Sequence, residues 1–243
     1  MALSRRSLLG LIGTAAAALL VGCEPGAGPG WWRRLWSRKP AIASIPPCIV
    51  RPEQMEGPYF VDERLNRSDI RTDPTDGSVK EGVPLQLAIR VHGIRDNACA
   101  PIEGAMVDVW QCDAAGVYSD VRDDSFDTRG KKFLRGYQMT DADGTAPFLT
   151  IYPGWYPGRT VHIHFKIRLN PSSMFGYEFT SQIYFDDALT DEVFTQPPYS
   201  KGRRTTNHQD GIFENGGEAL MLPLTKQPEG GYAGTFDIGL QLT

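Results

Sequence analysis

Cysteine and histidine are scarce in this chain, which restricts the metal sites that it can build. The 243 residues include four cysteines and four histidines. The cysteines stand at positions 23, 48, 99 and 112, and none has the paired spacing of a structural zinc site. The sequence also has no obvious internal repeats. A cysteine-based zinc domain is therefore not expected, and a metal site would have to use other side chains.

Long hydrophobic runs are missing too. The run at 8–21 falls short of the about 20 residues that cross a membrane. It follows the pair Arg5-Arg6, so residues 1–23 are predicted to be a twin-arginine signal peptide. The four residues that end at Cys23 resemble the lipobox of bacterial lipoproteins, and a plain N-terminal anchor helix is the alternative. We expect export by the twin-arginine route to the periplasm or cell envelope, with a lipid anchor at Cys23.

Basic residues are outnumbered by acidic ones after residue 47. Residues 24–47 are rich in proline, glycine and tryptophan and are predicted to be a linker, either at a membrane–water interface or as an unstructured tether. Residues 1–47 hold six basic side chains and one acidic one, so residues 48–243 carry 19 basic and 28 acidic residues, a net charge of −9. We expect 48–243 to form one domain that does not bind nucleic acid.

A helical hydrophobic period is absent after the linker, apart from one turn near Asp191. Short segments of alternating apolar residues are instead separated by turn sequences. This pattern predicts an all-β protein, an antiparallel β-sandwich with long active-site loops. We expect the second strand to run antiparallel to the first. The predicted strands are 85–91, 106–110, 136–140, 148–151, 161–169, 181–185 and 236–242.

An exported domain can contain a disulfide. Cys99 and Cys112 are separated by 13 residues that include a strand, so at about 3.3 Å per residue these two are expected to lie far apart. We therefore expect Cys48 to pair with either Cys99 or Cys112, with one thiol left over.

The strand predicted at 161–169 carries the most informative pattern. Its odd-numbered residues are apolar, so His162 and His164 lie on one face, which is predicted to point away from the core. Two imidazoles at this spacing can share a metal ion, although each can also be a structural residue. The preceding loop contains two Pro-Gly pairs, which make it stiff, and it carries Tyr156 and Arg159.

A second candidate segment is 107–120. Here a strand ends in the turn Asp113-Ala114-Ala115-Gly116 and then presents Tyr118. The turn can equally be structural, with the tyrosine packed at its edge.

Together these segments resemble the intradiol ring-cleavage dioxygenases, the family of catechol and protocatechuate 3,4-dioxygenases. The resemblance runs from about 52 to 185 and rests on Pro52–Phe60, Trp110–Tyr118 and Pro153–Phe165. It implies one Fe(III) per chain, held by Tyr118, Tyr156, His162 and His164. It also implies that Arg159 and Gln182 act in catalysis, and that Arg159 and Tyr59 contact the substrate.

The resemblance further implies a reaction. A catechol-type diol would be cleaved by O2 to a cis,cis-muconate-type diacid, with Tyr156 leaving the iron to take a substrate proton while Tyr118 stays bound. Phenolates are hard anionic donors, which suits Fe(III). Arg159 would stabilise negative charge or, alternatively, brace its loop by a salt bridge. Tyr59 can equally be a packing aromatic.

Two other functions compete with this one. A non-catalytic, lipid-anchored β-sandwich binding module would use its aromatic residues as stacking platforms, and a zinc hydrolase would need a carboxylate near the histidine pair. Convergence of Tyr118 and Tyr156 on the two histidines distinguishes the enzyme. The oligomeric state and the ring substituents stay open; a carboxylate on the ring would need a basic partner, for which the candidates are Lys131, Lys132, Arg135 and Arg203.

Overall fold

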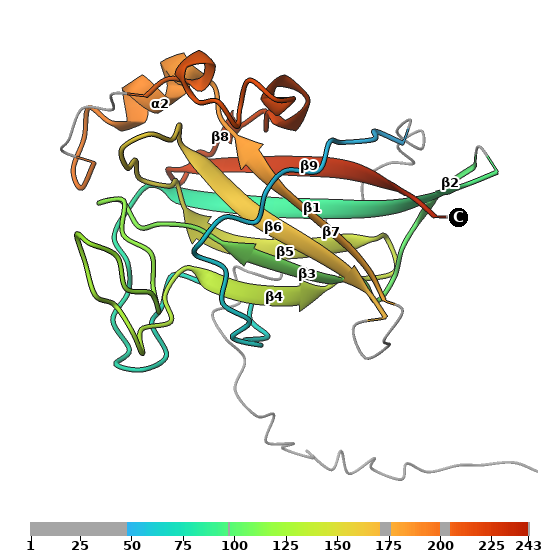
Figure 1. Ribbon diagram of the computed structural model, residues 1–243, viewed down its shortest axis with the longest axis horizontal. Helices are drawn as coiled ribbons and strands as arrows, with labels where there is room; N and C mark the ends of the chain where they lie inside the picture. The colour runs from blue at the N-terminus through green and yellow to red at the C-terminus, as the bar shows by residue number, and fades with distance from the viewer. Residues whose placement is uncertain (1–47, 97, 171–175, 200–204, 243) are drawn as a thin grey trace, which may run out of the picture. The chain divides into compact units, whose positions relative to one another are not determined.

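The computed structural model describes residues 48–96, 98–170, 176–199 and 205–242. The predicted signal peptide and linker at 1–23 and 24–47 lie outside these residues, as does Arg203. Two β-sheets dominate the described chain (Figure 1). The predicted sandwich architecture is therefore confirmed.

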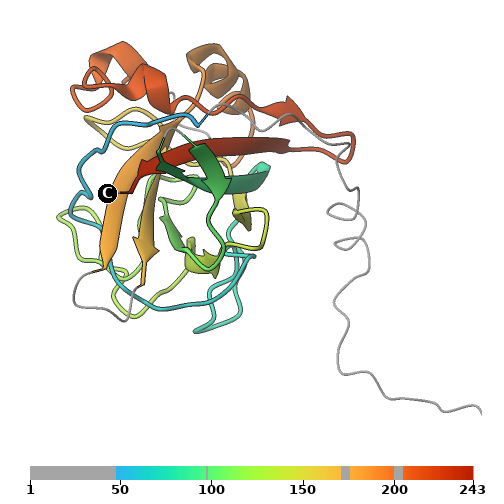
Figure 2. The ribbon, with the colours of Figure 1, turned by 90° about the vertical axis from the view of Figure 1, so that its right-hand side faces the viewer.

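The first sheet is built around its longest strand, β1. This strand pairs with β2 and β5 in antiparallel fashion and with β9 in parallel, and β8 follows β9. The parallel pair β1–β9 is an exception to the predicted antiparallel arrangement, and Figures 1 and 2 show β9 lying along β1. The strands span Pro84–Arg95 (β1), Ala98–Pro101 (β2), Thr145–Ile151 (β5), Thr225–Lys226 (β8) and Tyr232–Gln241 (β9).

The second sheet is entirely antiparallel and carries the histidine strand. Its order is β4-β3-β6-β7. The strands span Met106–Trp110 (β3), Arg135–Met139 (β4), His162–Leu169 (β6) and Tyr177–Tyr184 (β7). The strand at 106–110, expected to run antiparallel to that at 85–91, is not its neighbour, because the two segments belong to different sheets. Alternation fixes which face of a strand is buried but not which strand is its neighbour.

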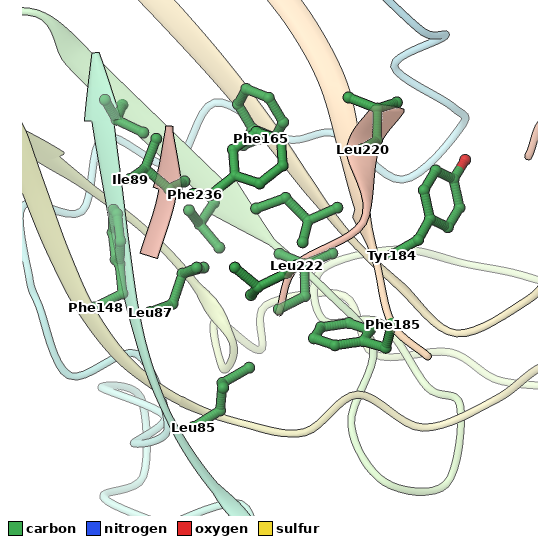
Figure 3. Packing of buried hydrophobic residues seen from close by; sticks show 14 of the residues in the cluster. Leu85, Leu87, Ile89, Phe148, Phe165, Tyr184, Phe185, Leu220, Leu222 and Phe236 are labelled. Carbon is green, nitrogen blue, oxygen red and sulfur yellow. The ribbon is translucent and has the colours of Figure 1, made fainter. Parts of the chain in front are cut away.

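The core lies between the two sheets. Figure 3 shows Leu85, Leu87 and Ile89 of β1 in the same cluster as Phe165 of β6. Phe165 also packs edge-on against Phe236 of β9, with ring centroids 5.4 Å apart. The buried odd-numbered residues of β6 thus form the inner face of the second sheet, and the even-numbered residues point to its outer face.

Three short helical segments follow β7 and gather at one end of the sheets (Figures 1 and 2). They are α2 (Asp187–Val193) and the 3-10 turns η1 (Asn207–Gln209) and η2 (Gly217–Leu220). The helical turn expected near Asp191 is confirmed as α2, whose N-terminus is capped by the Asp186 carboxylate accepting from Leu189 N. Among the described residues, no helix is long and apolar enough to cross a membrane.

A disulfide joins Cys48 to Cys99, with Cα atoms 5.7 Å apart. This confirms one of the two pairings that the sequence left open. Cys112 is the remaining thiol of the described chain, and it is buried. The disulfide attaches the start of the domain to β2, beside the place where Gly239 N donates to Ile49 O.

Candidate metal centre

Strand β6 and its two neighbours set the positions of the histidines. In the sheet register His164 lies between Trp110 of β3 and Gln182 of β7, and the indole of Trp110 stacks on the His164 ring at 5.0 Å with an interplanar angle of 8°. The histidine side chains do point away from the core, as alternation predicted. They are nevertheless buried, at 2% exposure for His162 and 1% for His164.

The segment 52–62 explains this burial, because it crosses the outer face of β6 and β7. Gln182 Nε2 of β7 donates to Met55 O at 3.0 Å, and Lys166 Nζ of β6 pairs with the Glu56 carboxylate. Close packing over the cluster requires Gly57, whose φ is +76° and where a Cβ would lie 3.3 Å from His164 Cε1. The segment that the resemblance singled out therefore covers the histidine pair.

His162 occupies the centre of a cluster of ring donors. Its Nδ1 lies 2.6 Å from Thr160 O, so Nδ1–H donates there and the Nε2 lone pair is directed into the cluster. Nε2 lies 3.1 Å from His164 Nε2, 3.4 Å from the Tyr118 hydroxyl and 3.2 Å from the Tyr156 hydroxyl. The structure thus brings all four predicted ligands to one point, which was the condition that separated an enzyme from a binding module.

Two loops dock against each other to deliver the tyrosines. Gly154 N donates to Asp113 O at 3.1 Å, joining the Pro-Gly loop to the turn before Tyr118. Gly116 has φ +83°, and a Cβ there would be 2.3 Å from Trp155 O, so only glycine allows this approach. The turn at 113–116 is therefore structural, and it also serves the cluster by holding both tyrosine-bearing loops together.

The two tyrosines differ in their surroundings. Tyr118 is fully buried, and its ring is stacked on Tyr59 with centroids 4.5 Å apart. Tyr156 is only partly buried and lines an open cavity together with Tyr59. Tyr118 is thus enclosed by packing, whereas Tyr156 borders the cavity.

Burial keeps the cluster electrically neutral before any metal binds. It lowers the pKa of His162 to about 3, with help from the nearby Arg159 cation, and lowers the pKa of His164 further below its ordinary range. Burial also raises the pKa of the phenols of Tyr118 and Tyr156. A bound cation reverses this preference for the neutral phenol, so metal binding would release the phenol protons.

The donor set fits a metal ion. Bonds from a metal to an imidazole nitrogen are about 2.0–2.1 Å, so donors that share one ion lie roughly 3 Å apart. His162 Nε2 lies 3.1–3.4 Å from each of the other three donors. The described residues contain no group of three or more His, Cys, Asp or Glu side chains placed to hold a metal. The cluster therefore depends on its two phenols for a sufficient number of ligands, and phenolate oxygens favour a hard trivalent ion.

Arg159 and Gln182 lie at the cluster, as the resemblance implied. Arg159 Nη1 is 3.4 Å from His162 Nε2, and its Nη2 donates to Gln182 Oε1. Gln182 in turn donates through Nε2 to Met55 O at 3.0 Å. Gln182 thus links the guanidinium to the covering segment 52–62.

Asp210 is a positioning residue that the sequence did not reveal. Its carboxylate is 1% exposed and accepts from Arg159 Nε at 2.9 Å and from Thr160 N at 2.9 Å. It fixes both the guanidinium and the backbone whose carbonyl orients His162. No local pattern marks Asp210, because it lies in an irregular segment 51 residues after Arg159.

Replacing Asp210 by asparagine is expected to lower kcat roughly 10- to 100-fold, because the charge-assisted bond that aims Arg159 is weakened. The metal content should stay unchanged, since no predicted ligand is removed. Steady-state kinetics and metal analysis check this. The matched control is Asp237→Asn, which alters a similar Arg–Asp pair with Arg90 on another part of the fold. An equal decrease in kcat in both variants, or loss of metal from Asp210→Asn, would contradict the role of Asp210 as a positioning residue.

Comparisons with known proteins agree with this geometry. A family model described as Dioxygenase matches residues 55–240. The beta chain of protocatechuate 3,4-dioxygenase from Burkholderia cepacia is 38% identical over 164 residues, which cover 63% of this chain and 68% of that relative. An intradiol ring-cleavage dioxygenase from Tetranychus urticae superimposes with a TM-score of 0.67 at 32% identity, covering 80% of this chain and 95% of that chain.

This chain belongs to the intradiol ring-cleavage dioxygenase family. A catechol 1,2-dioxygenase from Candida albicans is also similar, at 34% identity over 104 residues, although this covers only 31% of that relative and 42% of this chain. The dioxygenase assignment confirms the predicted enzyme class over the binding module and the zinc hydrolase.

Proposed function

We propose that this dioxygenase uses one Fe(III) per chain to cleave a catechol-type diol with O2 to a cis,cis-muconate-type diacid. The observation that carries the proposal is the convergence of Tyr118, Tyr156 and His164 on His162 Nε2 within 3.4 Å. In the balanced reaction, the bond between the two hydroxyl-bearing carbons breaks, both oxygen atoms of O2 enter the product, and no external reductant is consumed. When bound, Fe(III) supplies a Lewis acid that makes the diol's ring reactive towards O2.

Individual residues of the chain are assigned the other roles in the reaction. Tyr156, ionised once the metal is bound and placed beside the cavity, accepts a proton from the substrate hydroxyl and becomes the neutral phenol again. Tyr118, fixed by its stacking on Tyr59, stays in place as a ligand. Arg159 directs positive charge at the cluster and stabilises the negative charge that develops on the substrate. Trp110 and segment 52–62 keep bulk water away from the histidines.

The iron requirement has a direct test. Protein loaded with Fe(III) should be red to purple, because phenolates transfer charge to ferric iron, and it should contain close to one iron per chain by elemental analysis. A colourless protein with stoichiometric zinc and undiminished activity would refute the iron proposal.

The activity is tested by oxygen uptake with a panel of catechols. Consumption of one O2 per diol and the absorption spectrum of a muconate-type product are expected. A product in which the ring has been opened next to the two hydroxyl-bearing carbons, instead of between them, would contradict the proposed reaction.

We also propose that the enzyme is exported by the twin-arginine route and anchored at Cys23. Arg5-Arg6, the following apolar run and the residues before Cys23 support this. The Cys48–Cys99 disulfide fits an oxidising compartment outside the cytosol. Fractionation of expressing cells should recover the protein with the cell envelope, and recovery of reduced protein in the cytosol alone would contradict the proposal.

A further inference from the structure

An open cavity lies directly beside the ligand cluster. It has a volume of about 550 Å³, and its walls include the rings of Tyr59, Phe126, Trp155 and Tyr156. Tyr59 forms the connection to the cluster, because its ring stacks on Tyr118 and meets Tyr156 edge-on at 6.2 Å. The cavity adjoins the donors, so it is the space that the far end of a bound diol's ring would enter.

Asp123 has the only charged side chain among the described residues that line this cavity. Its Oδ2 accepts from the Tyr59 hydroxyl at 2.6 Å, and its Oδ1 accepts from Ser125 N and Oγ. These hydrogen bonds lower the pKa of Asp123, so the carboxylate is ionised at neutral pH. They also fix its position at the cavity wall, where the Tyr59 ring lies between Asp123 and Tyr118.

No described basic residue neutralises this charge. Asp127, in the same loop, pairs with Arg129 at 2.7 Å, whereas no described cation forms an ion pair with Asp123. Of the four residues considered as partners for a substrate carboxylate, Arg203 lies outside the described residues and the other three are engaged elsewhere. Lys131 pairs with Asp76, Lys132 with Glu63, and Arg135 donates to Ser119 O.

We infer that this cavity selects catechols whose ring substituent is uncharged or positively charged over those that bear a carboxylate, and that Asp123 determines this preference. The inference rests on the proposed function, since it concerns the substrate of the same site. The carboxylate repels an anionic substituent and attracts a cationic one, and the aromatic rings that line the same cavity also favour a cation. Because the cavity is open to solvent, the effect of one charge amounts to a few-fold change in affinity.

The test compares three diols that differ mainly in the charge of a one-carbon substituent. These are 4-methylcatechol, 3,4-dihydroxybenzoate and 3,4-dihydroxybenzylamine. Substituents also change the intrinsic reactivity of the ring, so the informative quantity is the ratio of kcat/KM for the amine to that for the benzoate, compared between wild type and Asp123→Asn. Asparagine keeps an oxygen that accepts from Tyr59 and removes the charge. The control Asp143→Asn makes the same change in net charge in the β4–β5 hairpin, outside the cavity.

We expect the ratio in Asp123→Asn to fall about threefold to tenfold, with no change in Asp143→Asn and a smaller difference at high salt. A second readout is independent of turnover. Dissociation constants measured without O2, from quenching of tryptophan fluorescence, should show the same change, since Trp155 lines the cavity.

Equal ratios in wild type and Asp123→Asn, by both readouts, would overturn the inference. Preferred binding of the benzoate by the wild type would overturn it as well. If none of the diols is cleaved, the proposed function fails, and the anaerobic dissociation constants then decide the charge preference separately.

Discussion

Replacing His162 by alanine is expected to abolish stable iron binding and to lower activity by more than about 100-fold. Loss of a partner that merely orients a ligand costs 10- to 100-fold in many metal sites, so loss of the proposed central ligand should cost more. His162 Nε2 is the atom from which the other three donors lie 3.1–3.4 Å away. Iron analysis, the visible charge-transfer band and oxygen uptake measure the effect.

The control for this variant is His208→Ala. His208 is exposed, and its imidazole pairs with Glu214 instead of the cluster. It should keep iron, colour and activity. Because His162 is buried, its removal can also disturb folding, so circular dichroism and reloading with Fe(III) belong to the experiment. Wild-type protein stripped by a chelator should recover on reloading, whereas the folded alanine variant should not. Full iron occupancy in His162→Ala would show that this side chain is not a ligand.

Replacing Tyr156 by phenylalanine is expected to lower kcat by roughly 10²- to 10⁴-fold while most of the iron is retained. The range is that of a lost proton acceptor in general acid–base catalysis. Iron should remain because Tyr118, His162 and His164 are unaffected. The ring of Tyr156 lines the open cavity, and phenylalanine preserves that wall. Single-turnover kinetics and the visible spectrum separate the proton-transfer defect from loss of metal.

Tyr118→Phe is the matched comparison, because it removes the other phenol hydroxyl. Tyr118 is fully buried and packed against Tyr59, so its hydroxyl is assigned to metal binding alone. That variant should lose iron affinity, and added iron should restore part of its activity. Undiminished turnover in Tyr156→Phe would refute the role of this tyrosine, as would a result in which the two variants behave alike.

The covering segment shows where sequence patterns stop being informative. Alternation in β6 predicted a polar outer face, and side chains at 162, 164, 166 and 168 do point there. Their burial could not be predicted, since it depends on segment 52–62 crossing the strand more than 100 residues away in sequence. The segment helps to satisfy a charge that it buries, because Arg168 donates to Asp62 at 3.1 Å. Arg168 also donates to Asp108 of the neighbouring strand β3 at 2.7 Å.

The sequence by itself determined the local features of this protein. A period of two placed His162 and His164 on one strand face, and the Pro-Gly pairs indicated a stiff loop around Tyr156. The resemblance carried by three motifs then implied the four ligands, and the structure brings these together. Such features are predictable because neighbours in sequence share one strand or one turn, whose geometry depends on few residues.

The tertiary structure alone decided which distant segments meet. It separated β1 from β3, paired β1 with β9 in parallel and chose Cys99 as the partner of Cys48. It also brought Asp210 to Arg159, and Asp123 to the wall of the cavity. The physical reason is the same in each case: these contacts follow from how the two sheets pack and where their loops close, and such long-range choices leave no periodic mark in the chain.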